Sequence, residues 1–255
     1  MPDLPTTRRL EELTLNTSPA IHQALYDGWL LRASGTDTRR ANSATAMLPS
    51  SLPLEEKIAG TEAWYRTHGQ PAIFRLTEAL APPELDGLLQ ERGYSREVET
   101  WVMTRDLSAG IPPGDYHVPS GAKVLERSET DGLEDIHRMR AVSPEMRAQD
   151  LKRQALWKGP QVYLSLKTIN GVASTGMARM EAGHLGIFNM RTASKARDKG
   201  YATILVAYLL AWGLDQGARD AFLQVDQANA PAIAVYKKFG FSPAYSYWHR
   251  VQQTV

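Results

Sequence analysis

Apolar positions in the second part of the chain alternate between strand and helix periods. Residues 122–125 read as a strand, and residues 131–139 place apolar side chains at helical spacing. Residues 162–166 alternate between apolar and polar, and Asn170-Gly171 follows as a strong hairpin signal. The pattern therefore predicts a strand, a helix and then a hairpin.

The periodicity continues in the same manner to the end of the chain. The next predicted elements are strands over 172–180 and 185–190, a helix from Tyr201 to Gly217, a strand over 222–225, a helix from Pro231 to Gly240 and a strand over 245–251. Strands that alternate with helices after an early hairpin predict an α/β fold with a mixed sheet.

The first part of the chain gives a similar but sparser pattern. Its predicted elements are strands over 29–32, 43–48 and 73–76, with helices over 54–66 and 84–92. The segment LQERGYS at 89–95 parallels YKKFGFS at 236–242, and a proline opens both preceding helices. A single match of this kind is compatible with chance or with a structural repeat. In a repeat, Leu89 would occupy the place of Tyr236, and the first half would lack that tyrosine's chemistry.

A break separates these two parts. Residues 108–114 read SAGIPPG, and two prolines between glycines suit neither a helix nor a sheet interior. We expect a linker there, which leaves two segments of about 110 and about 140 residues, each of ordinary domain size. The predicted domains span residues 1–110 and 117–255.

Composition narrows the class of protein. The 255 residues contain no cysteine, and 29 Lys+Arg balance 28 Asp+Glu to a net charge of +1. Disulfides, cysteine-ligated zinc and a thiol nucleophile are therefore excluded, and a nucleic-acid partner is disfavoured. No apolar run approaches the ~20 residues that span a bilayer, and the first residues lack a signal-peptide core. A soluble cytoplasmic protein without a membrane partner is expected.

One short segment indicates anion binding. Arg197-Asp198-Lys199-Gly200-Tyr201-Ala202 lies between a predicted strand and an amphipathic helix. Free backbone N–H groups at a helix start, beside two cations, suit a pyrophosphate. Neither the nucleoside-triphosphate loop nor the three-glycine dinucleotide fingerprint is present. The alternative interpretation is a basic turn that caps a surface helix.

A second motif downstream makes the turn more specific. Residues 223–241 read LQVDQANAPAIAVYKKFGF, and together with the turn they resemble the GCN5-related N-acetyltransferase superfamily over residues 120–250. The segments WLLR at 29–32 and RANS at 40–43 resemble the N-terminal half of its tandem members. This resemblance implies an α+β fold with a mostly antiparallel sheet flanked by helices, in two tandem halves. Because the first half lacks the R-x-x-G-x-G/A turn, we expect it to be degenerate and only the second half to be catalytic.

The resemblance also implies a cofactor and a set of site residues. The co-substrate would be acetyl-CoA, and no metal is expected. The residues that match the family's cofactor contacts are Met190, Arg191 and Thr192 on a splayed strand, the pyrophosphate turn Arg197, Asp198, Lys199, Gly200, Tyr201 and Ala202, and Asn229. Tyr236 matches the tyrosine that protonates the departing thiolate, although a tyrosine before Gly-Phe is also a common packing residue.

The sequence offers no clear base. Residues 186–191, the predicted central strand, contain no carboxylate, and Glu181, His184 and Asp226 are weak candidates. We therefore expect deprotonation of the amine to be indirect. The segment 134–153 reads as a charged helix with a solvated face, whose acids Glu134, Glu145 and Asp150 could attract a cationic amine. The six histidines show no metal-ligand spacing.

The predicted function is direct acetyl transfer from acetyl-CoA to a primary amine of a small molecule. Candidate acceptors are an aminoglycoside-type antibiotic, which would imply antibiotic resistance, and an amino-acid-like metabolite. A protein or peptide N-acetyltransferase and a non-catalytic acyl-CoA-sensing module are the alternatives. The chain is expected to act as a monomer or a homodimer. Because there is no cysteine, no acyl-cysteine relay is available.

Overall fold

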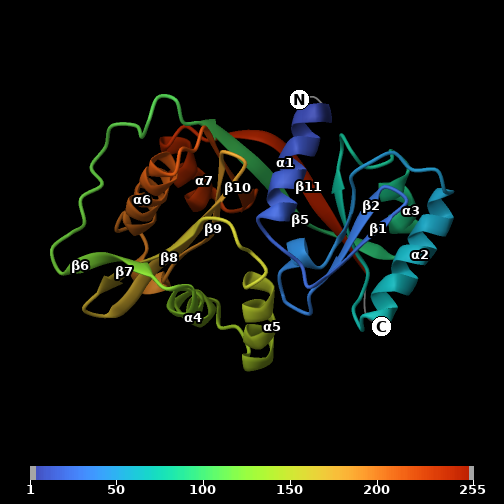
Figure 1. The fold of residues 1–255 in the computed structure, drawn as a ribbon, viewed down its shortest axis with the longest axis horizontal. Helices are drawn as coiled ribbons and strands as arrows, with labels where there is room; N and C mark the ends of the chain where they lie inside the picture. Colours follow the sequence, from blue (N-terminus) through green and yellow to red (C-terminus); the bar gives the residue numbers. More distant parts are fainter. Residues whose placement is uncertain (1–3, 253–255) are drawn as a thin grey trace.

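A single sheet of eleven strands forms the centre of the computed structural model, which describes residues 4–252 (Figure 1). The helices are α1 (Leu4–Asn16), α2 (Leu54–Thr67), α3 (Leu85–Glu91), α4 (Glu129–Arg140), α5 (Pro144–Gln154), α6 (Tyr201–Asp215) and α7 (Ala230–Lys238), with short 3-10 turns η1 (Arg39–Ala41) and η2 (Ser194–Ala196). The strands are β1 (His22–Tyr26), β2 (Trp29–Ala33), β3 (Ala44–Ala46), β4 (Ile73–Thr77), β5 (Tyr94–Asp106), β6 (Ala122–Arg127), β7 (Gln161–Thr168), β8 (Gly171–Glu181), β9 (His184–Thr192), β10 (Asp220–Asp226) and β11 (Ser242–Gln252).

The sheet is mixed and mostly antiparallel, as predicted. Its strand order is β1-β2-β3-β4-β11-β5-β10-β9-β8-β7-β6. The β3–β4 and β9–β10 pairs are parallel, and the other neighbours are antiparallel. The parallel β9–β10 pair needs a long crossover, and the segment that carries η2 and α6 provides it.

The centre of the sheet is symmetric in its strand order. The units β4-α3-β5 and β10-α7-β11 have the same sequence of elements, and each places its last strand beside the other unit. β11 therefore lies between β4 and β5, and β5 lies between β11 and β10. The two similar segments at 89–95 and 236–242 occupy equivalent places, where α3 leads into β5 and α7 leads into β11. The sheet runs unbroken across the predicted linker, and the division at 110–117 stays a prediction.

Helices cover both faces of the second half of the sheet. Along β7, Val162 and Leu164 pack in one cluster with α6 and α7, while Tyr163 packs in another with α1 and α4. Alternate residues of a strand point to opposite faces, so the two clusters lie on opposite sides of the sheet. In Figure 1, α1 lies across the middle of the molecule, near β5 and β11. A third cluster fills the first half around Trp29, Phe74 and Leu89.

The charged segment 134–153 is not one solvated helix, so that prediction was wrong. It divides into α4 and α5 because Ala141 adopts a left-handed conformation (φ 52°) and Ser143-Pro144 starts a new helix. Asp150 and Arg153 are buried, and so is His137 on α4. Across the described residues, every helix is too short or too polar to span a bilayer.

Candidate active site

β9 and β10 are paired over only part of their length. The register runs from His184 opposite Asp220 to Ile187 opposite Leu223, where it ends. Just beyond, Asn189 has a positive φ of 53°, and the β8–β9 register shifts between Thr175 and Met177. A bulge of this kind bends a strand and redirects its side chains. The backbone groups of β9 that face β10 therefore lose their strand partners beyond Ile187 and can bind a ligand.

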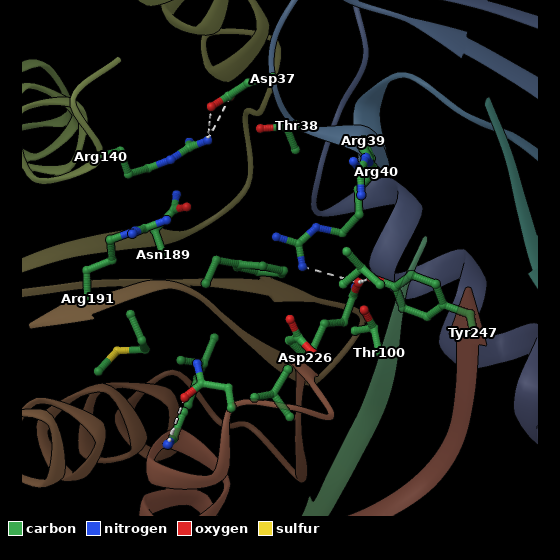
Figure 2. A pocket seen from close by; sticks show the side chains of 18 of the residues that line it. Asp37, Thr38, Arg39, Arg40, Thr100, Arg140, Asn189, Arg191, Asp226 and Tyr247 are labelled. Atoms are coloured by element: carbon green, nitrogen blue, oxygen red, sulfur yellow. Dashed lines mark hydrogen bonds and ion pairs between the residues drawn. The ribbon is translucent and has the colours of Figure 1, made fainter. Parts of the chain in front are cut away.

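A cavity of about 450 Å³ opens at this separation of the strands (Figure 2). Its wall combines residues of β5, α4, β9, β10, α7 and β11 with the segment around η1. The residues that line it are Asp37, Thr38, Arg39, Arg40, Val98, Thr100, Arg140, Ile187, Phe188, Asn189, Met190, Arg191, Gln224, Val225, Asp226, Asn229, Ala232, Tyr236, Tyr247 and His249. The first and second parts of the chain thus build one cavity together.

Four of the site residues predicted from the sequence meet at this cavity. Met190 and Arg191 line it from β9, Asn229 from the start of α7, and Tyr236 from the middle of α7. Thr192 belongs to β9 but does not line the cavity, and its hydroxyl lies 3.0 Å from that of Ser174.

Tyr236 brings a protonated phenol to the cavity wall. The residue is 7% exposed, and within residues 4–252 its hydroxyl has no hydrogen-bond partner. Burial raises the pKa of Tyr236 to about 12, so the phenol stays protonated at neutral pH. The matching position in the first half, Leu89, is fully buried in the core and has no ionisable group.

Asn229 has a structural task of its own. It is the N-cap of α7, and its side-chain oxygen accepts a hydrogen bond of 3.2 Å from the backbone N–H of Ala232. The side-chain amide NH₂ is the group that remains for a ligand.

The predicted pyrophosphate turn lies at the start of α6. Asp198 and Gly200 both have positive φ, 60° and 74°, and α6 begins at Tyr201. No side chain caps this helix, so its first N–H groups are not satisfied by a cap. Arg197 and Lys199 are exposed, and in the described part of the chain neither forms an ion pair. A Cβ at Gly200 would meet nothing within 4 Å. The turn therefore offers an open, positively charged cradle that fits an anion.

The acidic candidates are mostly elsewhere. Glu181 faces His184 across the β8–β9 hairpin, at the end of β9 remote from the opening. Asp226 does line the cavity, and its carboxylate accepts a hydrogen bond of 2.9 Å from the N–H of Ala228.

The three acids expected to attract an amine are not in the cavity wall. Asp150 is buried, where His137 and Arg153 are its partners. Glu134 instead pairs with Arg138 and Arg147 on the surface. Glu145, in the first turn of α5, is exposed.

Much of the cavity wall consists of residues that were not predicted from the sequence. Asp37, just before η1, accepts two hydrogen bonds of 2.6 and 2.7 Å from Arg140 at the end of α4, which closes one side of the cavity (Figure 2). Arg40, Gln224, Tyr247 and His249 also line the cavity, from three separate segments. No local pattern could link these residues, because the fold alone brings them together. Among residues 4–252, no group of three or more histidines and acids gathers as a metal site.

The chain is similar in sequence to known acetyltransferases. A family model described as "Probable histone acetyltransferase Rv0428c C-terminal" matches residues 6–250. The curated protein "Uncharacterized N-acetyltransferase YobR" of Bacillus subtilis (strain 168) is 26% identical over 247 residues, which are 96% of this chain and 98% of that protein. A mycothiol acetyltransferase of Nocardioides sp. (strain ATCC BAA-499 / JS614) is 25% identical over 241 residues, or 84% of this chain and 74% of the other.

A solved structure shows the same fold. The GCN5-related N-acetyltransferase from Kribbella flavida superimposes with a TM-score of 0.71 at 13% sequence identity. The match covers 97% of this chain and 96% of that chain. The whole architecture, with both halves of the sheet, is therefore shared.

Proposed function

The chain belongs to the acetyltransferase family of the probable histone acetyltransferase Rv0428c C-terminal region and is an N-acetyltransferase of the GCN5-related type, and we propose that it transfers acetyl directly from acetyl-CoA to a primary amine of a small molecule. The family membership confirms the resemblance predicted from the sequence. The observation that carries the proposal is the end of β9–β10 pairing at Ile187 and Leu223, which opens a cavity beside Tyr236.

The opening and the turn that follows β9 would together fit acetyl-CoA. The uncapped start of α6, with Arg197 and Lys199 beside it, would hold the pyrophosphate. The unpaired edge of β9 at Met190 and Arg191 would hold the pantetheine arm through backbone hydrogen bonds. When bound there, acetyl-CoA supplies the activated acetyl group.

The chain's own groups then act on the transfer. A backbone N–H of β9 beyond Ile187 can donate to the thioester oxygen as negative charge develops on it. The new C–N bond forms as the C–S bond breaks, and Tyr236 donates its proton to the departing sulfur. The proton that the amine loses can then restore the phenol. The absence of cysteine from all 255 residues leaves no acyl-cysteine route.

Removal of the proton from an ammonium acceptor is proposed to be indirect. β9 carries no carboxylate between His184 and Thr192. Two acids line the cavity: Asp37 is paired with Arg140, and Asp226 has no cation partner among the described residues, but one of its oxygens accepts from Ala228 in the turn before α7. A chain of water molecules could carry the proton from the ammonium group to Asp226 or to bulk solvent.

Two tandem halves are part of the proposal. The symmetric order β4-β11-β5-β10 and the equivalent positions of segments 89–95 and 236–242 support an internal duplication. The first half would then have lost its tyrosine, and would instead contribute Asp37, Arg39 and Arg40 to the cavity wall. A cavity closed by the Asp37–Arg140 pair suits a compact acceptor better than an extended peptide.

The test is release of free coenzyme A thiol from acetyl-CoA with a panel of acceptors. The panel contains amino acids, neutral amines, polyamines, an aminoglycoside and a lysine-containing histone-tail peptide. Turnover with small amines is expected. Turnover with the peptide alone would replace the small-molecule proposal by a protein acetyltransferase. Binding of acetyl-CoA, seen as increased thermal stability, with no turnover across the panel would favour a sensing module.

A further inference from the structure

One end of the cavity holds hydrogen-bond donors without acceptors. The side-chain oxygen of Gln224 accepts from three groups, namely Arg40 Nη1 at 3.2 Å, Arg75 Nη1 at 3.4 Å and the Tyr247 hydroxyl at 2.8 Å. These three donors fix the orientation of the amide, because its NH₂ group could not accept from them. Gln224 Nε2 is then left buried with no partner among the described residues.

His249 is a second unsatisfied group at the same end. It is 4% exposed and lines the cavity, and within residues 4–252 neither ring nitrogen has a hydrogen-bond partner. Burial, together with the charges of Arg75, Arg39 and Arg40, lowers the pKa of His249 well below its usual value. The ring is therefore neutral at pH 7 and carries one N–H donor that has nothing to bind. A buried polar group of this kind costs stability unless a ligand satisfies it.

Arg40 supplies the charge. It lines the cavity, half-buried, and its side chain extends into the cavity in Figure 2. Its neighbours are neutralised, since Arg39 pairs with Glu97 and Arg75 pairs with Glu11. Arg40 has no carboxylate partner among the described residues, and its guanidinium donates to the side-chain oxygen of Gln224.

The surroundings of Arg40 add to the positive charge. A small adjoining cavity of about 20 Å³ shares Thr38, Arg40, Phe188 and Asn189 with the main one and is also lined by Arg153 and Arg179. Arg153 pairs with Asp150, but Arg179 is held by Gln154, Gln161 and the carbonyl of Thr17, which are all neutral. Arg32, which is buried and donates to the carbonyl oxygen of Arg40, likewise has only neutral partners in the described structure. Unpaired buried cations favour an anion nearby.

We propose that Arg40, Gln224 Nε2 and His249 bind the carboxylate of the acceptor, so that the small molecule that is acetylated is an amino acid or another amine that carries a carboxylate. This inference rests on the proposed function and specifies its substrate class. A carboxylate matches the planar fork of a guanidinium and can accept from the two neutral donors as well. With the carboxylate at this end, the amine of the acceptor points toward the opening between β9 and β10.

The same charges act against cationic acceptors. A polyamine, an aminoglycoside or a basic peptide would bring further positive charge next to Arg40, in a setting that screens charge poorly. The two acids of the cavity wall, Asp37 and Asp226, do not offset this, because four arginines line the same cavity and Arg140 already occupies the carboxylate of Asp37. The arrangement therefore selects against these acceptors as well as for amino acids.

The test compares acceptors in matched pairs with the full-length protein. α-, β- and γ-amino acids are each assayed beside the carboxamide of the same skeleton, and kcat/KM is measured from thiol release at saturating acetyl-CoA. The carboxylate form is expected to be preferred about 10- to 100-fold, which is typical for loss of hydrogen bonds to a charged group. The chain length with the greatest preference gives the spacing between the carboxylate subsite and the acetyl group.

Two variants and a control assign the preference to Arg40. Arg40→Gln should raise KM for the carboxylate acceptor about 10-fold or more, bring the carboxylate-to-amide ratio close to one and leave acetyl-CoA affinity unchanged. Arg40→Lys, which keeps the charge without the fork, should retain part of the preference. Arg138→Gln, at an exposed arginine outside the cavity, should behave as wild type.

The possible results separate this inference from the proposed function. Carboxamides acetylated as well as amino acids at every length would overturn the carboxylate subsite and leave the acetyltransferase proposal standing. An unchanged preference in Arg40→Gln would also overturn it. No thiol release with any amine, charged or neutral, would instead contradict the proposed function.

Discussion

Ile187 on β9 and Leu223 on β10 form the last residue pair of the only parallel contact in the second half of the described sheet. Up to this pair the two strands are paired with each other, and the side chains of Ile187 and Leu223 are buried in the core. After it the strands separate, and Met190, Asn229 and Tyr236 come to line one cavity. The proposed chemistry of the site depends on this opening, because it would expose backbone donors of β9 beside the buried phenol of Tyr236.

Replacement of Tyr236 by phenylalanine should separate catalysis from binding. The variant keeps the ring that packs against Phe241 but removes the proton, so kcat should fall about 100-fold while the Kd of acetyl-CoA changes little. Because the pKa of Tyr236 is about 12, its deprotonation should not lower the wild-type rate below about pH 10. Single-turnover kinetics and calorimetric titration measure the two quantities.

A matched control for this substitution is Tyr208→Phe on α6, where the hydroxyl belongs to an exposed residue outside the cavity. This control should retain the wild-type rate. A Tyr236→Phe enzyme that is as fast as wild type would remove Tyr236 from the acid role.

The two ends of α6 allow a test of the pyrophosphate turn. Gly200 and Gly217 have similar positive φ values, 74° and 80°, and a Cβ at either would meet nothing within 4 Å. Valine at each position should therefore lower the free energy of unfolding by a similar amount, about 1–2 kcal/mol. Only Gly200→Val should weaken the binding of acetyl-CoA, since the valine side chain would project beside the N–H groups that would hold the pyrophosphate. Equal affinities in the two variants would contradict this position for the cofactor.

Acid should destabilise the protein through Asp150. The side chain is buried, with His137 Nε2 at 2.8 Å and Arg153 Nε at 2.9 Å. Burial opposes ionisation, but the hydrogen bond to His137 and the charge of Arg153 outweigh it and lower the pKa of Asp150. An unfolded aspartate has a pKa of about 3.9, so this stabilisation is complete above that value and is lost as pH falls toward the lower folded value.

Urea unfolding at a series of pH values measures this effect. Asp150→Asn should lower the free energy of unfolding at pH 7 by about 3–5 kcal/mol, because Arg153 then loses its buried partner. The remaining stability should decline less steeply below about pH 4 than in wild type. Glu134→Gln, which alters an exposed ion pair, should change stability by about 0–1 kcal/mol. If the free energy of unfolding of Asp150→Asn depended on pH as in wild type, Asp150 would not be the source of the acid sensitivity.

Much of the second half could be predicted from the sequence because its signals are local. The Asn170-Gly171 turn, the glycine at 200 and the helix from Pro231 depend on neighbouring residues, and each element forms where expected. The motif around Asn229 and Tyr236 likewise lies on one short helix, so its two residues reach the same cavity. The end of β9–β10 pairing at Ile187 and Leu223 is consistent with the splayed strand that the family resemblance implies.

Features that depend on distant segments could not be predicted in this way. α1 was missed because polar residues, Thr7, Glu11 and Thr14, occupy its buried face beside Leu10, which hides the apolar period. The position of β11 between β4 and β5 was not predicted either, because a strand's own residues do not specify which strand it pairs with. The carboxylate subsite joins a loop, β10 and β11, and its signal is an unmet hydrogen-bond requirement that only the structure reveals.

The most direct test of the central claim is a crystal structure of the protein with coenzyme A. The expected result places the pyrophosphate on the turn from Arg197 to Ala202, the pantetheine arm along β9 beyond Ile187 and the sulfur within hydrogen-bonding reach of the Tyr236 hydroxyl. Coenzyme A bound away from the separation of β9 and β10, or with its sulfur remote from Tyr236, would contradict direct acetyl transfer at this site.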